Sequence, residues 1–457
     1  MAQAFFGGVH PHDMKAATNE KAIEQLAPPA VVVIPMSMHF GAPCTPLVKA
    51  GDHVKVGQKI GEFHGLGAPI HASVSGTVKV VEPQPYSMGG NMMSVVIEND
   101  FQNELSEEVK APADPNALSV EEMVEIVKNA GIVGMGGATF PTHVKITSGI
   151  GKVNTVIING AECEPYITGD HRTMLERPEE IIGGAKFLAK MFGVDKVVIG
   201  VEDNKRNGID AMNKVIAEQK APVVVEPLRC RYPQGGEKQL CQAITGRQVP
   251  PGGLPADIGC AVFNINTTCA IYRALTTGMP VVRKIVTVSG SGVVEPKNLE
   301  CPIGTPVSSL LDACGGLKDG TYKLIAGGPM MGMAQYTADI SVAKGTGAIL
   351  AFCENEEKTV ENPQCIRCGK CVSVCPMHLE PLFMYQYASK GMVEELNDAH
   401  IMDCMECGAC SYICPARMHL THMFKTGKQL VKDKAAADRA AAEAKKKAEE
   451  AKEAAAK

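Results

Sequence analysis

Eight cysteines near the C-terminus repeat one spacing pattern. Each copy reads C-x2-C-x2-C-x3-C-P; the first contains Cys365, Cys368, Cys371 and Cys375, and the second contains Cys404, Cys407, Cys410 and Cys414. At this spacing, three thiolates fit three corners of a 4Fe-4S cube, and the fourth reaches the partner cluster. The sequence therefore predicts two adjacent clusters that pass electrons singly. The predicted ligand sets are Cys365, Cys368, Cys371 with Cys414, and Cys404, Cys407, Cys410 with Cys375.

A structural zinc site is the alternative for closely spaced cysteines. Zinc takes four ligands, usually from two paired hooks, whereas each copy here supplies three cysteines and a fourth marked by proline. The length of the pattern and its repetition favour iron-sulfur clusters.

A glycine-rich loop far upstream, GIVGMGGATFPTHVK, is the second feature suited to chemistry. Gly134, Gly136 and Gly137 let backbone amides approach an anion or a flat ring closely. Pro141 favours a helix start, whose free N–H groups attract phosphate. The glycines do not follow the G-x-G-x-x-G dinucleotide spacing, so a plain tight turn is the alternative.

Polar residues recur at the turns that follow this loop. Residues 153–158 predict a buried strand, and the strands predicted at 196–201 and 222–226 follow helical segments, which indicates a βαβ alternation. Turns at the carboxyl ends of such strands bind ligands in open α/β sheets. The residues at these turns are Asn159, Glu162, Glu164, Gly235, Gly236, Glu237, Asn264, Asn266 and Thr267. Exposed acids at turns are common, so the alternative for each glutamate is an ordinary surface acid that binds no ligand.

The elements around these sites suggest further domains. Short Val- and Ile-rich strands predict a small β-barrel or sandwich at residues 42–99. This stretch resembles the lipoyl and biotinyl carriers, but its turn HGLGAP lacks the lysine that carriers acylate, which favours a scaffold over a swinging arm. Residues 283–352 predict a β-grasp order. The Ala-, Lys- and Glu-rich residues 434–457 predict a solvated helix or a frayed tail.

Composition restricts the partners. The 457 residues imply several domains, and a net charge of -5 without a basic, aromatic-rich block argues against nucleic acid. No apolar run reaches the length of a membrane span, so any membrane role is expected to come through partner subunits. Seventeen cysteines without a secretory signal favour a reducing cytoplasm.

Four turns in order, GMGGATFPTHVK, NGAECEP, YPQGGEKQL and NINTT, resemble the FMN and NADH site of the flavoprotein subunit of respiratory complex I. The chain more closely resembles the family of the C subunit of the Rnf complex, a membrane-associated ferredoxin:NAD+ oxidoreductase. That family shares the opening FFGGVHPHDMK, the carrier-like barrel and the duplicated cysteine pattern. The resemblance extends from residue 1 to about residue 425.

The resemblance implies roles for individual residues. The FMN phosphate and ring edge would be held by Gly134, Gly136, Gly137 and Lys145. The flavin and NADH cleft would be lined by Asn159, Glu162, Glu164, Gly235, Gly236, Glu237, Asn264, Asn266 and Thr267. The chain departs from the complex I flavoprotein at Met135, which replaces an Arg, and at Ala161, which replaces an Asp and removes a hydrogen-bond acceptor. No catalytic acid or base is expected, because hydride transfer depends on positioning.

The resemblance also implies a multidomain α/β architecture. The expected domains are an N-terminal lipoyl-like barrel sandwich (1–110), a Rossmann-like FMN/NADH-binding domain (111–282), a β-grasp, SLBB-like domain (283–354), a helical double 4Fe-4S ferredoxin-type domain (355–430) and a tail (431–457).

The expected cofactors are FMN, two 4Fe-4S clusters and NAD(H). Because NADH transfers two electrons and a cluster one, FMN would convert between them. The expected setting is peripheral, on the cytoplasmic side of a bacterial membrane. The expected partners are the other subunits of the complex, which would translocate ions, and ferredoxin, directly or through another subunit. The alternatives are a diaphorase subunit of a soluble hydrogenase or formate dehydrogenase, and an electron-carrying scaffold with clusters alone.

Overall fold

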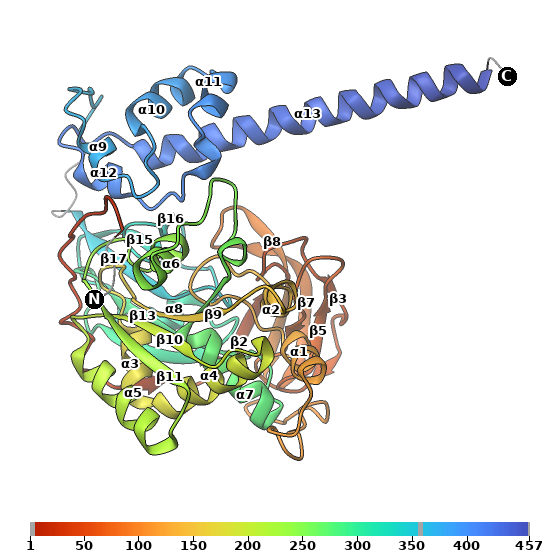
Figure 1. Ribbon diagram of the computed structural model, residues 1–457. Helices are drawn as coiled ribbons and strands as arrows, with labels where there is room; N and C mark the ends of the chain where they lie inside the picture. Colours follow the sequence, from red (N-terminus) through yellow and green to blue (C-terminus); the bar gives the residue numbers. More distant parts are fainter. Residues whose placement is uncertain (1–4, 355–359, 456–457) are drawn as a thin grey trace. The chain divides into compact units, whose positions relative to one another are not determined.

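The computed structural model describes residues 5–354 and 360–455, with side chains up to residue 447. The chain divides into two compact units, whose elements are labelled in Figure 1. In the described ranges, the first unit runs from Pro11 to residue 354. The second unit combines Phe5–His10 with residues 360–455.

The first domain of the first unit is a barrel of two small antiparallel sheets. Their strand orders are β2-β8-β7-β4 and β3-β5-β6. The strands are β2 (Val31–Pro35), β3 (Thr45–Pro46), β4 (His53–Val54), β5 (Lys59–Glu62), β6 (Ile70–His71), β7 (Gly76–Pro85) and β8 (Asn91–Asn99). Val32 pairs with Ile97 and Ile34 with Val95, and all four side chains are fully buried. The alternating apolar residues thus face the barrel core.

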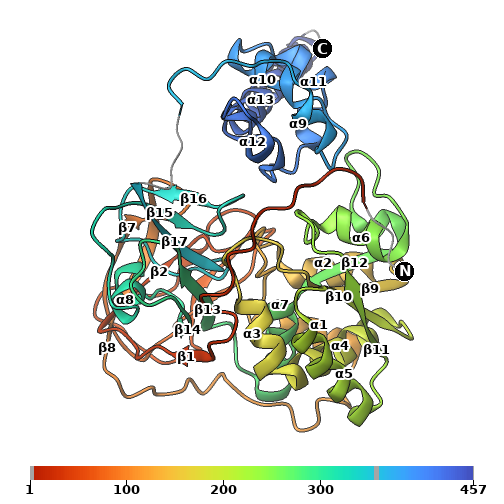
Figure 2. The same ribbon diagram turned by 90° about the vertical axis from the view of Figure 1, so that its left-hand side faces the viewer.

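The second domain is a parallel sheet covered by helices (Figure 2). Its strand order is β11-β10-β9-β12. The strands are β9 (Thr155–Gly160), β10 (Val197–Glu202), β11 (Val223–Leu228) and β12 (Cys260–Asn264). The helices are α1 (Val120–Asn129), α2 (Thr142–Gly149), α3 (Gly169–Glu176), α4 (Pro178–Phe192), α5 (Arg206–Gln219), α6 (Glu237–Thr245), α7 (Ile265–Thr277) and the short η1 (Pro255–Ile258). The chain order reverses between β9 and β12, and such a switch point is where open α/β sheets bind ligands.

Local sequence explains the ends of these helices. Ser119 and Glu122 form a capping box at the start of α1, and Asn264 caps α7 by accepting a hydrogen bond from the Asn266 backbone. Helices α4 and α7 pack closely because α4 carries Gly184, whose added Cβ would lie 2.2 Å from the Thr268 carbonyl oxygen.

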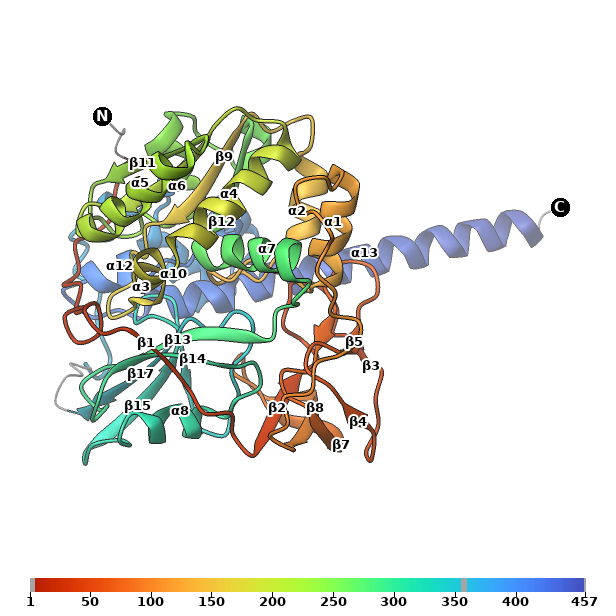
Figure 3. The same ribbon diagram turned by 90° about the horizontal axis from the view of Figure 1, so that it is seen from below.

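The third domain is a mixed sheet of the order β1-β14-β13-β17-β15-β16 (Figure 3). Its elements are β1 (Ile23–Gln25), β13 (Arg283–Ser289), β14 (Lys297–Pro302), α8 (Val307–Ala313), β15 (Thr321–Ala326), β16 (Met333–Gln335) and β17 (Ala348–Cys353). Strand β1 comes from the N-terminal region and pairs in parallel with β14. The sequence patterns did not indicate β1 or β14.

The second unit is helical. Its elements are α9 (Lys370–Ser373), α10 (Pro381–Ser389), α11 (Val393–Asp398), η3 (Ile401–Asp403), α12 (Ala409–Ile413) and α13 (Leu420–Ala455). Met384, Leu396, Ile401 and Phe424 form its core. The tail predicted at 434–457 continues α13 as a helix up to Ala455. Among the described helices, none combines the length and the apolar character needed to cross a membrane.

Residues 5–35 are distributed over both units and over two domains of the first unit. Phe5–His10 belongs to the second unit, β1 joins the β-grasp sheet and β2 joins the barrel. Between them, Lys15 bonds to the turn after β9. This differs from the expectation that residues 1–110 form one domain, because extended segments without periodic apolar residues carry no local signal of their partners.

Candidate redox sites

Two cavities in the second unit are lined by the predicted cluster cysteines. The first cysteine cavity, of about 280 Å³, is lined by Cys365, Cys368, Cys371 and Cys414. The second cysteine cavity, of about 20 Å³, is lined by Cys375, Cys404, Cys407 and Cys410. Each cavity therefore gathers three cysteines of one copy and the fourth of the other, the same grouping that the spacing predicts.

The two cavities differ in exposure. Cys365 and Cys368 are exposed, whereas Cys375, Cys407 and Cys410 are buried. Burial raises the pKa of the Cys407 and Cys410 thiols to about 12. Such thiols carry their protons at neutral pH, so binding of iron there would release protons.

The donor set fits an iron-sulfur cube. Four cysteines line each cavity, and the cysteines of a cube bind different irons, so they surround the cluster. In the part of the chain that the structure describes, no three His, Cys, Asp or Glu side chains converge on a single ion. Backbone amides of Leu379 and Glu406 donate to Cys375 Sγ and Cys404 Sγ, each at 3.4 Å. Hydrogen bonds to sulfur help to set cluster potentials.

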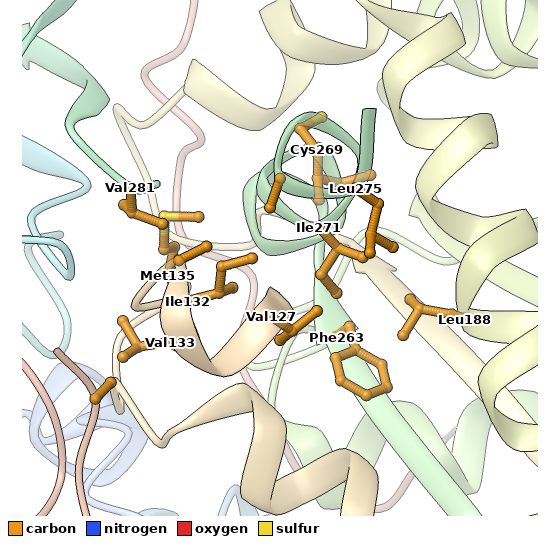
Figure 4. Packing of buried hydrophobic residues seen from close by; sticks show 14 of the residues in the cluster. Val127, Ile132, Val133, Met135, Leu188, Phe263, Cys269, Ile271, Leu275 and Val281 are labelled. Atoms are coloured by element: carbon orange, nitrogen blue, oxygen red, sulfur yellow. The ribbon is translucent and has the colours of Figure 1, made fainter. Parts of the chain in front are cut away.

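The glycine-rich loop lies in the second domain of the first unit. Buried apolar side chains at the beginning of the loop anchor it. Ile132, Val133 and Met135 belong to the same buried hydrophobic cluster as Ile271 and Leu275 of α7 (Figure 4). Beyond this anchor, residues 136–138 are exposed. A Cβ built on Gly137 meets nothing within 4 Å, and the φ of this residue is +137°, so the tip offers both space and backbone freedom.

Two polar side chains fix the backbone of the loop. Thr267 Oγ1 accepts a hydrogen bond from the Met135 amide at 2.9 Å and donates to the Val133 carbonyl at 3.2 Å. Lys284, from β13, donates to the Met135 carbonyl at 3.1 Å and is buried. Burial lowers the pKa of Lys284 to about 8, while the charge of Asp170 opposes this shift. Thr267 therefore acts on the loop, and Lys284 was not found by the sequence analysis.

The predicted residues of the carboxyl edge are close to one another. Asn159 and Asn264 are register partners at the ends of β9 and β12. Asn159 Nδ2 donates to the Gly235 carbonyl at 2.8 Å, which links the NGAECEP and PQGGE turns. A Cβ built on Gly136 would lie 3.2 Å from Asn264 Cβ, so the glycine-rich loop also reaches this edge.

Lys145 and Glu237 meet at the same edge. Lys145, from α2, donates to Glu237 Oε1 at 2.7 Å and to the Val262 carbonyl at 3.0 Å. Both side chains are partly exposed. Glu237 opens α6 directly after Gly236, so the free backbone N–H groups of this helix start lie beside the Lys145–Glu237 ion pair.

The carboxylates of Glu162 and Glu164 are engaged within the protein. Glu162 accepts from the backbone amides of Asp170 at 2.6 Å and His171 at 3.3 Å, which start α3. Glu164 accepts from the amides of Met330 at 3.1 Å and Met331 at 3.0 Å, in the β-grasp domain. Burial raises the pKa of each carboxyl to about 7, against these hydrogen bonds. Here, both residues position turns.

Asp170 organises the amides at the start of α7. Its Oδ2 accepts from Asn264 Nδ2 at 2.8 Å, and its Oδ1 accepts from Asn266 Nδ2 at 2.5 Å. Burial raises the pKa of Asp170, and the charge of Lys284 is the largest opposing influence. The Asp170 carboxylate thus fixes both side-chain amides, while Asn264 Oδ1 accepts from the Asn266 backbone amide as the cap of α7.

Two buried lysines clamp the turn after β9. Lys15 donates to the carbonyls of Glu162 at 2.9 Å and Glu164 at 3.0 Å. Lys205 donates to the Ala161 carbonyl at 2.7 Å and pairs with Glu202 at 3.2 Å. The turn includes a left-handed residue, Glu162, with φ +47°. Such a conformation costs of order 1 kcal/mol and persists only when its surroundings fix it.

Comparison with known proteins identifies the domains that contain these candidate sites. Family models match as follows: the RnfC barrel sandwich hybrid domain at residues 3–102, the Nuo51 FMN-binding domain at 127–273, the SLBB domain at 285–334 and the 4Fe-4S dicluster domain at 357–415. The predicted architecture of barrel sandwich, FMN domain, β-grasp domain and two-cluster domain is confirmed. The chain is an electron-transfer protein with FMN and 4Fe-4S cofactors.

Curated relatives define the family. The C subunit of the Na(+)-translocating ferredoxin:NAD(+) oxidoreductase complex of Acetobacterium woodii is 45% identical over 87% of this chain and 90% of that protein. The proton-translocating counterpart of Clostridium ljungdahlii is 43% identical over 88% of each chain. The chain belongs to the family of C subunits of ion-translocating ferredoxin:NAD(+) oxidoreductase complexes. A solved NAD+-reducing [NiFe]-hydrogenase chain is 18% identical, with a TM-score of 0.48 and coverage of 70% of this chain and 63% of that chain.

Proposed function

We propose that this chain exchanges hydride with NAD(H) at FMN and passes single electrons through two 4Fe-4S clusters. The observation that carries the proposal is the grouping of eight cysteines into two four-cysteine cavities, in a chain that also has an FMN-binding domain. FMN, when bound, supplies the conversion between two-electron and one-electron transfer.

The proposed flavin site is the carboxyl edge of the second domain. The exposed glycine tip would approach the ring edge and phosphate, with Lys145 and the start of α6 supplying positive charge. Asn159, Asn264 and Asn266 would orient the flavin and the nicotinamide by hydrogen bonds. Glu162, Glu164 and Thr267 would hold the surrounding turns, so their part is positioning rather than proton transfer.

The proposed cluster ligands follow the two cavities. Cys365, Cys368, Cys371 and Cys414 would hold one cluster, and Cys375, Cys404, Cys407 and Cys410 the other. The relatives carry names of complexes that translocate ions. These names support the proposal that this chain is a peripheral subunit of a membrane complex, and we propose that it lies on the cytoplasmic side. Ferredoxin would act directly or through a partner subunit, and other subunits would move ions.

Anaerobic purification tests the proposal. We expect about eight irons and one FMN per chain, and reduction of the clusters on addition of NADH. Iron near eight without FMN, and clusters that NADH leaves oxidised, would instead support the scaffold with clusters alone. Activity in a soluble assembly with a hydrogenase or formate dehydrogenase, without membrane subunits, would support the diaphorase alternative.

A ligand variant separates the two functions. Cys371→Ser is expected to remove or impair the cluster of the first cysteine cavity, so iron falls toward four per chain. NADH reduction of an artificial dye at the flavin should persist, because Cys371 and the flavin domain belong to different units. Cys353→Ser is the control, since Cys353 lines neither cavity. Loss of dye reduction together with the cluster would contradict the division into a flavin site and an electron path.

A further inference from the structure

The two copies of the cysteine pattern have the same local geometry after their fourth cysteine. The His378 amide donates to the Cys375 carbonyl, and the Arg417 amide donates to the Cys414 carbonyl, both at 3.2 Å. His378 and Arg417 both have a φ of +56°. Each loop continues its cysteine with a proline, so the repeated sequence gives a repeated backbone.

The surroundings of the two loops differ. Pro376 is buried, whereas Pro415 is exposed. The segment Phe5–Val9, here called the N-terminal cover, packs on the Cys375 loop. The Gly8 amide donates to the Val374 carbonyl at 2.8 Å, and the Phe6 ring stacks on His378 with 4.5 Å between ring centroids. The repeated pattern thus has a cover on one copy that comes from the opposite end of the chain.

The contact at Gly7 is close. A Cβ built on Gly7 would lie 2.7 Å from the Val374 carbonyl oxygen and 2.8 Å from the Cys375 carbonyl oxygen, and the φ of Gly7 is +75°. No other residue fits there without displacing the backbone of Cys375. Phe5 and Val9 are each only 3% exposed, so the cover is itself anchored by buried apolar side chains.

We propose that the N-terminal cover shields the cluster of the second cysteine cavity from water and gives it a lower reduction potential than the exposed cluster has. The proposal rests on the proposed function, because it requires clusters in both cavities. One-electron reduction adds negative charge to a cluster, and water stabilises that charge, so exclusion of water disfavours reduction. Gly7 and Phe6 are then positioning residues that act through the Cys375 loop.

Gly7→Ala and Phe6→Ala in the full chain test the proposal, with Gly65→Ala as the matched control. Gly65 has a φ of +71° and an added Cβ there meets nothing within 4 Å, so this variant reproduces the backbone strain without the contact. The readout is a potentiometric titration followed by electron paramagnetic resonance. The signal that persists in Cys371→Ser identifies the covered cluster.

For that signal, both cover variants should increase the reduced-to-oxidised ratio at the wild-type midpoint threefold or more. This equals an upward shift of about 28 mV, since a tenfold change is about 59 mV for one electron. The other signal and the Gly65→Ala protein should be unchanged. If Gly7→Ala selectively loses the covered cluster, the potential measured in Phe6→Ala decides.

Unchanged potentials in both cover variants, equal shifts of both signals, or loss of both clusters would overturn the proposal. A wild-type protein that contains FMN but no clusters would instead overturn the proposed function.

Discussion

Lys284 offers the sharpest test of how the protein holds a flavin. Its ammonium group donates to the Met135 carbonyl from a neighbouring domain, and Lys284→Met removes that bond while keeping most of the side-chain volume. A hydrogen bond to a charged group contributes about 1.5–3 kcal/mol. If this energy holds the glycine-rich loop in its binding conformation, its loss weakens FMN binding about 10- to 140-fold.

The assay is fluorescence titration of the flavin-depleted protein with FMN. Lys297→Met is the matched control, because Lys297 lies on the adjacent strand β14 and pairs with Glu24 at 3.1 Å, away from the loop. We expect Lys297→Met to bind FMN as the wild type does. An FMN dissociation constant of Lys284→Met within twofold of the wild type would refute the reasoning.

The pH dependence of FMN binding gives a second test of the hydrogen bond between Lys284 and Met135. The folded-state pKa of Lys284, about 8, lies below its ordinary value of 10.5. The folded protein therefore loses this proton at a lower pH than the unfolded chain does. As the pH rises through 8, the bond to Met135 loses its charge and wild-type FMN affinity should fall. The same titration of Lys284→Met should lack this step. A step of equal size in both proteins would assign it to another group.

Two further substitutions test contacts that stabilise the domains around the site. Burial raises the pKa of the Glu300 carboxyl, but hydrogen bonds from Arg177 and Gln25 and the charges of Arg177 and Arg273 outweigh this and lower it to about 2 from 4.5. The resulting stabilisation is complete above pH 4.5 and is lost as the pH falls through 2. Glu300→Gln should therefore lower the free energy of unfolding by roughly 3 kcal/mol at pH 7 and by less at pH 3, measured by urea unfolding; equal losses at both pH values would contradict the ion pair. Gly184→Ala should cost about 1–3 kcal/mol by overpacking α4 against α7, whereas Lys186→Ala on the exposed side of α4 should be neutral; equal thermal midpoints would count against the packing.

Local patterns predicted much of the fold because they depend on neighbouring residues. The three predicted strands of the flavin domain lie within two residues of β9, β10 and β11. Three cysteines of each group were predictable for the same reason, since their spacing is short, whereas the fourth comes from the other copy and was predicted from the repetition of the pattern.

The residues that fix the turns at the carboxyl edge of the second domain were not predictable in this way. Lys15, Lys205 and Lys284 look like ordinary charged residues, and their partners are set by tertiary contacts. One feature of the sequence indicated the role of Lys284. It lies in a strand whose following residues are all buried, and a lysine in such a strand requires a buried acceptor. The glutamates of the NGAECEP turn were identified, but the bonds of Glu164 to the β-grasp domain come from a segment distant in the sequence.

The position of the N-terminal cover has a consequence for biosynthesis. Phe5–Val9 is translated long before its partners Val374 to His378, because more than 300 residues separate the two segments in the sequence. At about 5–20 residues per second, the segment waits roughly 20 to 70 s for its binding surface. During this interval, the cysteine loops do not exist, so clusters can be inserted only after these loops have been translated. The cover therefore binds after the loops are made, and an iron-loading factor would reach the second cysteine cavity most easily before Phe5–Val9 packs on the Cys375 loop.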